Sequence, residues 1–328
     1  MSDRPVSMQQ IADALGVSRV TVANALGGRG RVSAAMAERV RQMAAELNFV
    51  PSHAGRALRL GRSTIIGLVV PDFTMPLFGV FVQAFERAAK ARGLALLIGD
   101  SMGSAQTQDE QLRDFAARGA DALILIPLRG GRFDPATLPV PVAVIDAAAN
   151  PLNTASSDHR EGGRLVARHL VALGHRHVEL LLASLQSNVS DERGAGMLEV
   201  FAEAGVQTRI SRIAPDLDSA RAFAAQWQPE GATAICAAYD ALGVGVISGL
   251  AERGLRVPED VSVTGFDDVI WGRIVSPALT TVRQDLAAIA EHALDVVTGE
   301  AQGPRLTPVA LVVRASTCPP PSSTKDRP

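Results

Sequence analysis

The sequence predicts a small head of three short helices followed by an α/β body whose parallel sheets are covered by helices. Three observations support this fold class. The chain has 328 residues, enough for about two domains and a small appendage. Capping residues and apolar residues at helical spacing organise residues 6–47. From residue 65 onward, apolar strand-like runs alternate with helical patterns, which is typical of parallel sheets with helices on both faces.

Composition and charge indicate a globular protein with a basic N-terminal end. Apolar residues make up 47% of the chain and charged residues 20%, which is ordinary for a protein with a sizeable core. The net charge is -2, but residues 1–62 contain nine arginines and four acidic residues, while the remainder is acidic. This asymmetry suggests a head that binds a polyanion, although a solvated charged face would give the same count.

Simple features exclude several protein classes. No apolar run reaches the roughly 18 residues of a membrane span, and the N-terminus lacks the apolar stretch of a signal peptide, so we expect a cytoplasmic protein with no membrane partner. Cys236 and Cys318 are too few for a disulfide framework or a cysteine-rich metal site. No G-x-G-x-x-G follows the first strand run and no G-x-x-x-x-G-K-[ST] occurs, so we expect no cofactor.

The head has the pattern of a helix-turn-helix. Three serines stand where helix caps are expected: Ser7, which forms a capping box with Gln10, and then Ser18 and Ser33. The first two helices are joined by a turn at Gly16, and the second helix of such a pair fits the major groove of DNA. A generic three-helix bundle would share the same pattern.

The body alternates strands and helices in a regular order. The predicted strands are residues 65–70, 94–98, 122–126, 142–145, 178–182, 234–237 and 261–264. The predicted helices are residues 77–92, 108–118, 161–173, 191–204 and 240–253, and each is followed by a glycine.

An enzyme is one alternative, because four aspartates follow strands, where α/β enzymes keep catalytic groups: Asp146, Asp240, Asp267 and Asp268. No G-x-S-x-G and no metal-spaced histidine cluster complete such a site, so we expect neither catalysis nor a metal. For Asp240 we expect an N-cap role. Solvated roles are expected for the histidines near helix ends: His159, His169, His175 and His177. A carbohydrate-processing enzyme and a solute receptor remain as alternative functions.

A dense set of motifs runs through the chain in a fixed order. The head contains "MQQIADALGVSRVTVANALGGRGRVSAAMAERVRQMAAELNFVP", followed by "SHAGRALR". The body contains "PDFTMPLF", "GADALILIP", "SDHREGGRLVARHLVALGH", "ERGAGM", "GFDD" and "PALTTVRQD". Together these motifs resemble the LacI/GalR (lactose-repressor/galactose-repressor) family of transcriptional regulators, over the head and essentially all of residues 63–316.

The resemblance implies an N-terminal all-α helix-turn-helix headpiece and an α/β periplasmic-binding-protein-like core of two doubly wound parallel-sheet subdomains. Residues 1–50 would form the headpiece, 51–62 the hinge helix or linker, and 63–316 the effector-binding and dimerisation core. The first subdomain would comprise about residues 63–156 and 286–313, and the second about 157–285 and 314–316. Residues 317–328 are expected to form a disordered tail.

The resemblance also assigns DNA contacts by position. Ser18 and Thr21 would hold phosphates, Arg19 and Val20 would face base edges, and Arg31 would lie near the backbone or a base.

Asn24 departs from the family pattern, which usually has an arginine there. It would pair with adenine or face a phosphate, so the operator is expected to differ from the usual half-site. In the hinge segment the matching positions are Ser52, Leu58 and Arg59. Leu58 would enter the minor groove as an apolar wedge with Arg59 beside it, although an ordinary core contact is the plain alternative.

Eight positions match the family's effector site, at the carboxyl ends of the strands: Met75, Leu77, Phe78, Asp146, Arg193, Tyr239, Asp267 and Gln284. Carboxylates and a guanidinium suit a hydroxyl-rich ligand, and an aromatic face suits a sugar ring or a planar base. Met75 and Tyr239 replace asparagines that the family often has, and Trp271 would either wall the pocket or pack in the core.

The predicted function is a homodimeric regulator of transcription, a repressor that binds double-stranded operator DNA. A small polar effector between the two core subdomains would control it allosterically, with a sugar as the first candidate and a nucleobase or nucleoside as the second. Induction and co-repression would differ only in which closure state the effector prefers.

Overall fold

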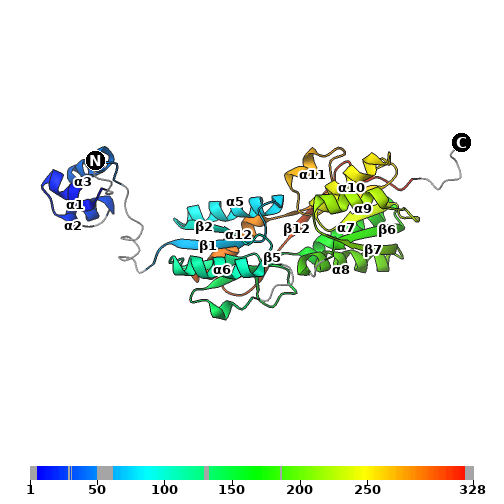
Figure 1. The fold of residues 1–328 in the computed structure, drawn as a ribbon, viewed down its shortest axis with the longest axis horizontal. Helices are drawn as coiled ribbons and strands as arrows, with labels where there is room; N and C mark the ends of the chain where they lie inside the picture. Colours follow the sequence, from blue (N-terminus) through cyan, green and yellow to red (C-terminus); the bar gives the residue numbers. More distant parts are fainter. Residues whose placement is uncertain are drawn as a thin grey trace. The chain divides into compact units, whose positions relative to one another are not determined.

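The computed structural model describes residues 6–28, 30, 32–49, 62–128, 133–184 and 187–321 (Figure 1). Contacts divide the chain into two compact units, Met1–Ser63 and Thr64–Pro328, which we call the headpiece and the core. Four of the predicted DNA-binding residues lie outside the described residues: Arg31, Ser52, Leu58 and Arg59. No helix in the described ranges is long and apolar enough to cross a membrane.

The headpiece contains three helices, α1 (Met8–Leu15), α2 (Arg19–Leu26) and α3 (Ala34–Glu46). Each begins at a predicted serine cap, whose side chain accepts a backbone N–H from the first turn: Ser7 with the full capping box, Ser18 and Ser33. Gly16 makes the left-handed turn between α1 and α2. The helices enclose a small core of Ile11, Ala12, Val22, Ala25, Val40 and Ala44. The predicted helix-turn-helix is therefore confirmed.

The first subdomain of the core is a six-stranded parallel sheet. Its order is β11 (Arg305–Thr307), β5 (Asn153–Ser157), β4 (Val142–Ile145), β3 (Ala122–Leu125), β1 (Ile65–Val70) and β2 (Ala95–Asp100). One face packs on α5 (Pro76–Ala91) and α12 (Leu286–Thr298), and the other on α6 (Ala105–Ala117), as Figure 1 shows. A 3-10 turn spans Pro135–Thr137.

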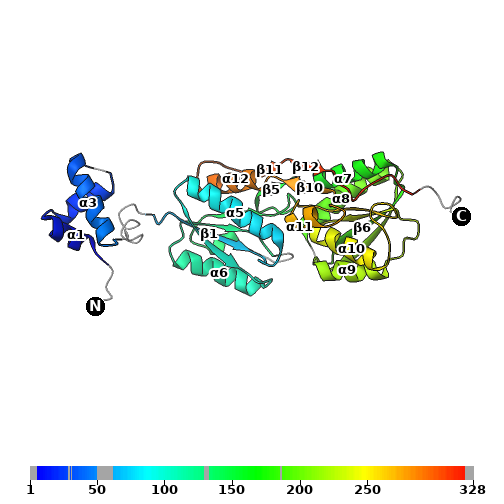
Figure 2. The same cartoon turned by 90° about the horizontal axis from the view of Figure 1, so that it is seen from above.

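The second subdomain has a four-stranded parallel sheet in the order β7 (Gln207–Ile213), β6 (His177–Ala183), β8 (Ala234–Ala237) and β9 (Ser262–Thr264). Two helical layers cover it, α7 (His159–Leu173) with α8 (Asn188–Glu203), and α9 (Leu217–Gln226) with α10 (Asp240–Glu252) (Figure 2). The short α11 (Ile270–Ile274) follows β9. Parallel sheets with helices on both faces confirm the predicted fold class.

The contact between α7 and α8 is unusually close. A Cβ atom on Gly163 of α7 would collide with the carbonyl oxygen of Arg193 on α8, and a Cβ on Gly196 of α8 would collide with the carbonyl oxygen of Arg160 on α7. Both positions therefore require glycine, and the two helix backbones touch without intervening side chains.

The chain crosses between the subdomains at three places: between β5 and α7, between β10 (Thr281–Gln284) and α12, and between β11 and β12 (Val309–Val312). Strands β10 and β12 pair antiparallel beside the second subdomain. Val309 and Leu311 pack against the second subdomain's core, so the predicted boundary at about residue 313 lies a few residues too late.

The C-terminal segment corrects the predicted tail. The Oγ1 atom of Thr317 lies 3.0 Å from Nε2 of His169, and the Cys318 N–H donates to Oγ of Ser262 at 3.1 Å. Disorder from residue 317 is therefore wrong for these two residues, because Thr317 bonds to α7 and Cys318 bonds to β9. The prediction for residues 322–328 lies outside the described residues.

Candidate functional site

Helix α2 presents the predicted DNA-contacting side chains on its open surface. Arg19 and Val20 are exposed in its first turn, and Val20 is 67% exposed although Val22 is fully buried. Oγ of Ser18 caps the helix and lies 2.9 Å from Oγ1 of Thr21. An apolar side chain left in solvent beside an arginine is suited to the edges of bases, where thymine offers a methyl group.

Asn24 lies one helical turn after Val20 and is half-buried. A Cβ atom on Gly30, which has a φ of 81°, would lie 3.0 Å from its Nδ2 atom. The Asn24 amide therefore lies over the backbone of the segment that follows α2.

Arg193 is the centre of the predicted effector site, and its side chain is 1% exposed. Nη2 donates to Oδ1 of Asp267 at 2.9 Å, and Nη1 donates to the carbonyl oxygen of Ala238 at 2.6 Å. The guanidinium carbon lies 3.7 Å from the ring centroid of Phe266 and 5.0 Å from that of Tyr239. The cation is thus neutralised by a carboxylate and enclosed by aromatic faces.

Asp267 extends this network toward the first subdomain. It lies in the loop after β9 with a φ of 118°, and its Oδ1 also accepts from Nε2 of Gln284 at 2.7 Å. Oε1 of Gln284 in turn accepts from Oγ of Ser157 at 2.7 Å. Ser157 and Gln284 stand at two of the three crossovers, so the network runs from α8 into the connection between the subdomains.

Two histidines depart from the solvated roles that we expected. His159 is 7% exposed, and burial, helped by the charge of Arg193, holds its pKa well below the usual value. The neutral ring accepts from Nε of Arg193 through Nδ1, at 3.4 Å. His175 is 1% exposed, with Nδ1 2.8 Å from Oγ1 of Thr233 and Nε2 3.0 Å from the carbonyl oxygen of Cys318. Both predictions were wrong because tertiary packing covers these helix ends.

Asp146 and Tyr239 make contacts of their own around this network. Oδ2 of Asp146 accepts from Nδ2 of Asn150 and from Nδ2 of Asn188, each at 2.9 Å. Asn188 begins α8, so this carboxylate joins the first subdomain to the second. The Tyr239 hydroxyl lies 3.0 Å from Oγ of Ser187, which caps the same helix.

The other three predicted residues lie at the start of α5. Met75 is its N-cap residue, and Leu77 and Phe78 pack against the core of the first subdomain. In the described part of the chain, no hydrogen bond or ring contact joins them to the Arg193 network. The structure therefore brings Arg193, Asp267, Gln284 and Tyr239 together but leaves the α5 residues apart.

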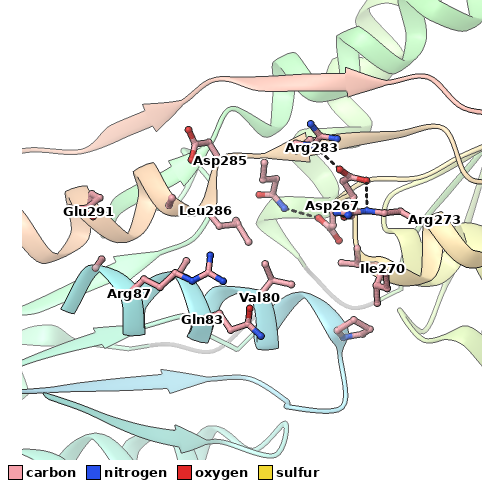
Figure 3. A pocket seen from close by; sticks show the side chains of 17 residues that line it. Val80, Gln83, Arg87, Asp267, Ile270, Arg273, Arg283, Asp285, Leu286 and Glu291 are labelled. Carbon is pink, nitrogen blue, oxygen red and sulfur yellow. Dashed lines mark hydrogen bonds and ion pairs between the residues drawn. The ribbon is translucent and has the colours of Figure 1, made fainter. Parts of the chain in front are cut away.

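A cavity of about 500 Å³ opens beside this network (Figure 3). Asp267 and Gln284 line one side, and α5 forms another side with Val80, Gln83 and Arg87. Two of the eight predicted effector residues thus face this cavity.

Asp240 is not the N-cap that we expected. Tyr239 holds the N-cap position of α10, and the Asp240 side chain is fully buried. Its Oδ2 accepts from the N–H of Val269 at 2.8 Å, and its Oδ1 accepts from the hydroxyl of Thr281 at 2.5 Å. The carboxyl therefore serves tertiary contacts rather than its own helix.

This carboxyl predicts a pH effect on stability. Burial, and then the charge of Asp267, raise the pKa of Asp240 from 3.8 to about 8. Between pH 3.8 and about pH 8, the folded protein thus retains a proton on Asp240 that the unfolded chain releases. The stability that this raised pKa contributes is full below pH 3.8 and is lost as pH rises to about 8. We expect the free energy of unfolding to fall between about pH 5 and pH 8 more steeply in the wild type than in Asp240→Asn. Urea unfolding of both proteins across this range measures the difference, and parallel curves would contradict the prediction.

Sequence reasoning missed several residues that the structure places in the network: Ser157, His159, Ser187, Asn188 and Phe266. Position was a partial signal, because Ser157 ends a strand, His159, Ser187 and Asn188 stand at helix starts, and Phe266 precedes the predicted Asp267.

Comparisons with known proteins agree with both units. Residues 7–52 match the model for bacterial regulatory proteins of the lacI family, and residues 167–317 match a periplasmic binding protein-like domain. A putative transcriptional regulator of the LacI family from Sanguibacter keddieii is 32% identical, with a TM-score of 0.68 over 78% of this chain and 98% of that one. The lac repressor dimer bound to operator and the anti-inducer ONPF is 28% identical, with a TM-score of 0.85 over 96% of this chain and 100% of that one. A transcriptional regulator CelR–cellobiose complex is 25% identical, with a TM-score of 0.69 over 95% of this chain and 100% of that one. The chain belongs to the LacI family of bacterial regulatory proteins.

Proposed function

We propose that this protein is a homodimeric transcriptional repressor that binds operator DNA through α2 and the hinge segment, and that a neutral sugar bound between the core subdomains controls it. It would act in the cytoplasm, where the chromosome lies. The observation that carries the proposal is that one chain contains both an exposed pair of side chains that can contact bases, Arg19 and Val20, and a buried polar network at the crossovers between the core subdomains.

The DNA-binding part rests on the headpiece. The net charge of +5 over residues 1–62 supplies phosphate contacts, and the first turn of α2 leaves Arg19 and Val20 free for bases. The lac repressor neighbour is a dimer on its operator, and its TM-score of 0.85 supports the same assembly here. Two copies of α2 would then read two half-sites.

The effector part rests on the chemistry of Arg193. A guanidinium has five N–H donors, of which three are used, by Asp267, Ala238 and His159. Since Asp267 already balances the charge, the remaining donors suit the hydroxyl groups of a neutral ligand better than an anion. A sugar fits this chemistry, and the CelR neighbour is a complex with cellobiose. A nucleobase is the second candidate, because the Tyr239 ring borders the same guanidinium.

Two linked experiments test the proposed function. Genomic footprinting of the full-length protein identifies its operator, and a thermal-shift screen of sugars and nucleobases identifies the effector. We expect a protected site with two-fold symmetry and a sugar that both raises Tm and changes operator affinity. Absence of any protected site would contradict the repressor, and a response to nucleobases alone would replace the sugar.

The hinge wedge is a separate prediction, carried by the resemblance of the segment around Leu58. We expect Leu58→Ala to reduce DNA bending and to weaken operator binding more than non-specific binding, because the alanine side chain is too short to enter a base step. Gel phasing measures the bend angle, with Leu60→Ala as the matched control in the same segment. An unchanged bend in Leu58→Ala, with the protein folded, would exclude this residue as the wedge.

A further inference from the structure

Asp240 lies where three segments of the second subdomain meet. It is the first residue of α10 and directly follows Tyr239. Its backbone N–H donates to the carbonyl oxygen of Phe266 at 2.7 Å, which brings the start of the helix against the loop after β9. Strand β10 lies on the other side of that loop, since the Asp267 N–H donates to the carbonyl oxygen of Val282 at 2.9 Å.

The two carboxyl oxygens of Asp240 hold two different segments. Oδ2 accepts from the N–H of Val269, at the end of the loop. Oδ1 accepts from the hydroxyl of Thr281, the first residue of β10. One side chain therefore ties the loop that carries Asp267 to the strand that carries Gln284.

Two glycines make room for this carboxyl. A Cβ atom on Gly265 would collide with its Oδ1, and a Cβ on Gly272 would lie 3.2 Å from its Oδ2. The backbone on both sides of the loop thus approaches the carboxyl as closely as a main chain can. Such a fit indicates a contact that fixes geometry rather than a polar group that is merely buried.

The loop requires an external tie because its own backbone is strained. Asp267 and Asp268 have φ values of 118° and 53°, which L-residues rarely adopt. Conformations of this kind persist when the surroundings hold them. The strained residue Asp267 is also the one whose Oδ1 lies between Arg193 and Gln284.

We propose that Asp240 is a positioning residue for the effector cleft: it ties the 265–269 loop to β10 and thereby holds the Asp267 carboxylate between Arg193 and Gln284. This role rests on the proposed function for the meaning of the cleft, but the geometry that it maintains exists without a ligand. A substitution that breaks this tie would release Asp267, although it changes none of the residues that face the cleft.

The test uses the full-length protein without a ligand and two pairs of variants. Asp240→Asn keeps the volume but replaces a carboxyl oxygen, which accepts a hydrogen bond even when it is protonated, by an NH2 group that cannot accept one. Thr281→Val removes the hydroxyl at nearly constant volume. Thr281→Ser restores the hydroxyl and serves as the rescue. Asp216→Asn is the matched control, because Asp216 caps α9 by accepting from the N–H of Ser219 at 2.7 Å and makes no contact with the loop among the described hydrogen bonds.

Two measurements report the position of Asp267. Hydrogen exchange follows the amides of residues 265–272, and 15N spectra of arginine-labelled protein follow the guanidinium protons of Arg193, assigned with Arg193→Lys. We expect Asp240→Asn and Thr281→Val to accelerate exchange in this loop by about tenfold or more and to abolish the protected Arg193 signals. Thr281→Ser and Asp216→Asn should leave both unchanged.

A lowered Tm with intact Arg193 signals in Asp240→Asn would overturn the proposal, because the carboxyl would then only stabilise the fold. Equal acceleration across the whole core would overturn it as well. If Asp240→Asn does not fold, the Thr281 variants decide, and they also remove or restore the acceptor of the Asp268 N–H, which donates to the Thr281 hydroxyl at 3.4 Å as part of the same tie. This test uses no sugar. A failed effector screen would therefore contradict the proposed function but would not contradict the positioning role of Asp240.

Discussion

Asp267→Ala is expected to lower the free energy of unfolding of the core by about 3–5 kcal/mol, because it leaves a buried arginine without its counter-ion. The side chains of Arg193 and Asp267 are 1% and 5% exposed, so water does not replace the lost partner. Nη1 of Arg193 would keep the carbonyl oxygen of Ala238, and its two aromatic neighbours would stay. None of these neutral groups balances the charge. Urea unfolding followed by circular dichroism measures the change.

A double-mutant cycle separates this pair from ordinary loss of packing. Arg193→Met fills the space against Phe266 with an uncharged chain, and it also leaves the Asp267 carboxylate without its guanidinium. The combination of Arg193→Met with Asp267→Ala removes both charges, so it should cost less than the sum of the single changes, by on the order of 0.5–3 kcal/mol. Strictly additive effects would show that the two residues act separately. The exposed pair of Arg118 and Asp114 offers the control, because truncation there should cost at most about 1 kcal/mol.

Operator affinity is expected to fall by about 10³ to 10⁵ between 50 and 200 mM salt if the dimer makes roughly six to ten phosphate contacts. The headpiece carries nine arginines and four acidic residues over residues 1–62, and a dimer would present this charge twice. Fluorescence anisotropy with a labelled operator, repeated over a series of salt concentrations, gives the slope. A slope near zero would show that phosphate contacts do not drive binding.

The deletion of residues 1–62 is the companion measurement. The core is a compact unit from Thr64 onward, so the fragment should retain its circular dichroism spectrum and its unfolding transition. It should lose operator binding entirely, since both the basic charge and α2 are absent. A folded fragment that binds the operator with full affinity would contradict the assignment of the headpiece.

The sequence predicted the strands that read as apolar runs, including β2 and β9 at the sheet edges, and missed strands that are polar or very short, including the interior β5 with the sequence NTASS. Strand β1 is buried along almost its whole length and reads as a continuous apolar run. Strand β7 has the sequence QTRISRI, lies at the edge of its sheet and alternates exposed with half-buried residues, so composition marks it as polar. Strand β11 has three residues and joins the first sheet from near the end of the chain, which no local pattern shows.

The candidate site shows the same division between local and tertiary signals. Motif positions brought Arg193, Asp267 and Gln284 together, and the structure joins these three side chains by hydrogen bonds. Asp240 and His159 were misassigned because an aspartate or histidine near a helix start has the same local sequence whether it caps the helix or lies against a distant loop. Their burial depends on segments that lie far along the chain, β10 for Asp240 and α8 for His159.

The touching backbones of α7 and α8 limit where this molecule can bend. At Gly163 and Gly196 no side chain separates the two helices, so α8 cannot shift along α7 by rearranging side chains there. Any side chain introduced at either position would force the helices apart. Arg193 is therefore carried by a stiff layer that begins immediately after the first crossover. When the second subdomain turns, α7 and α8 would therefore move together as one body, and the bending would fall on the three connecting segments between the subdomains.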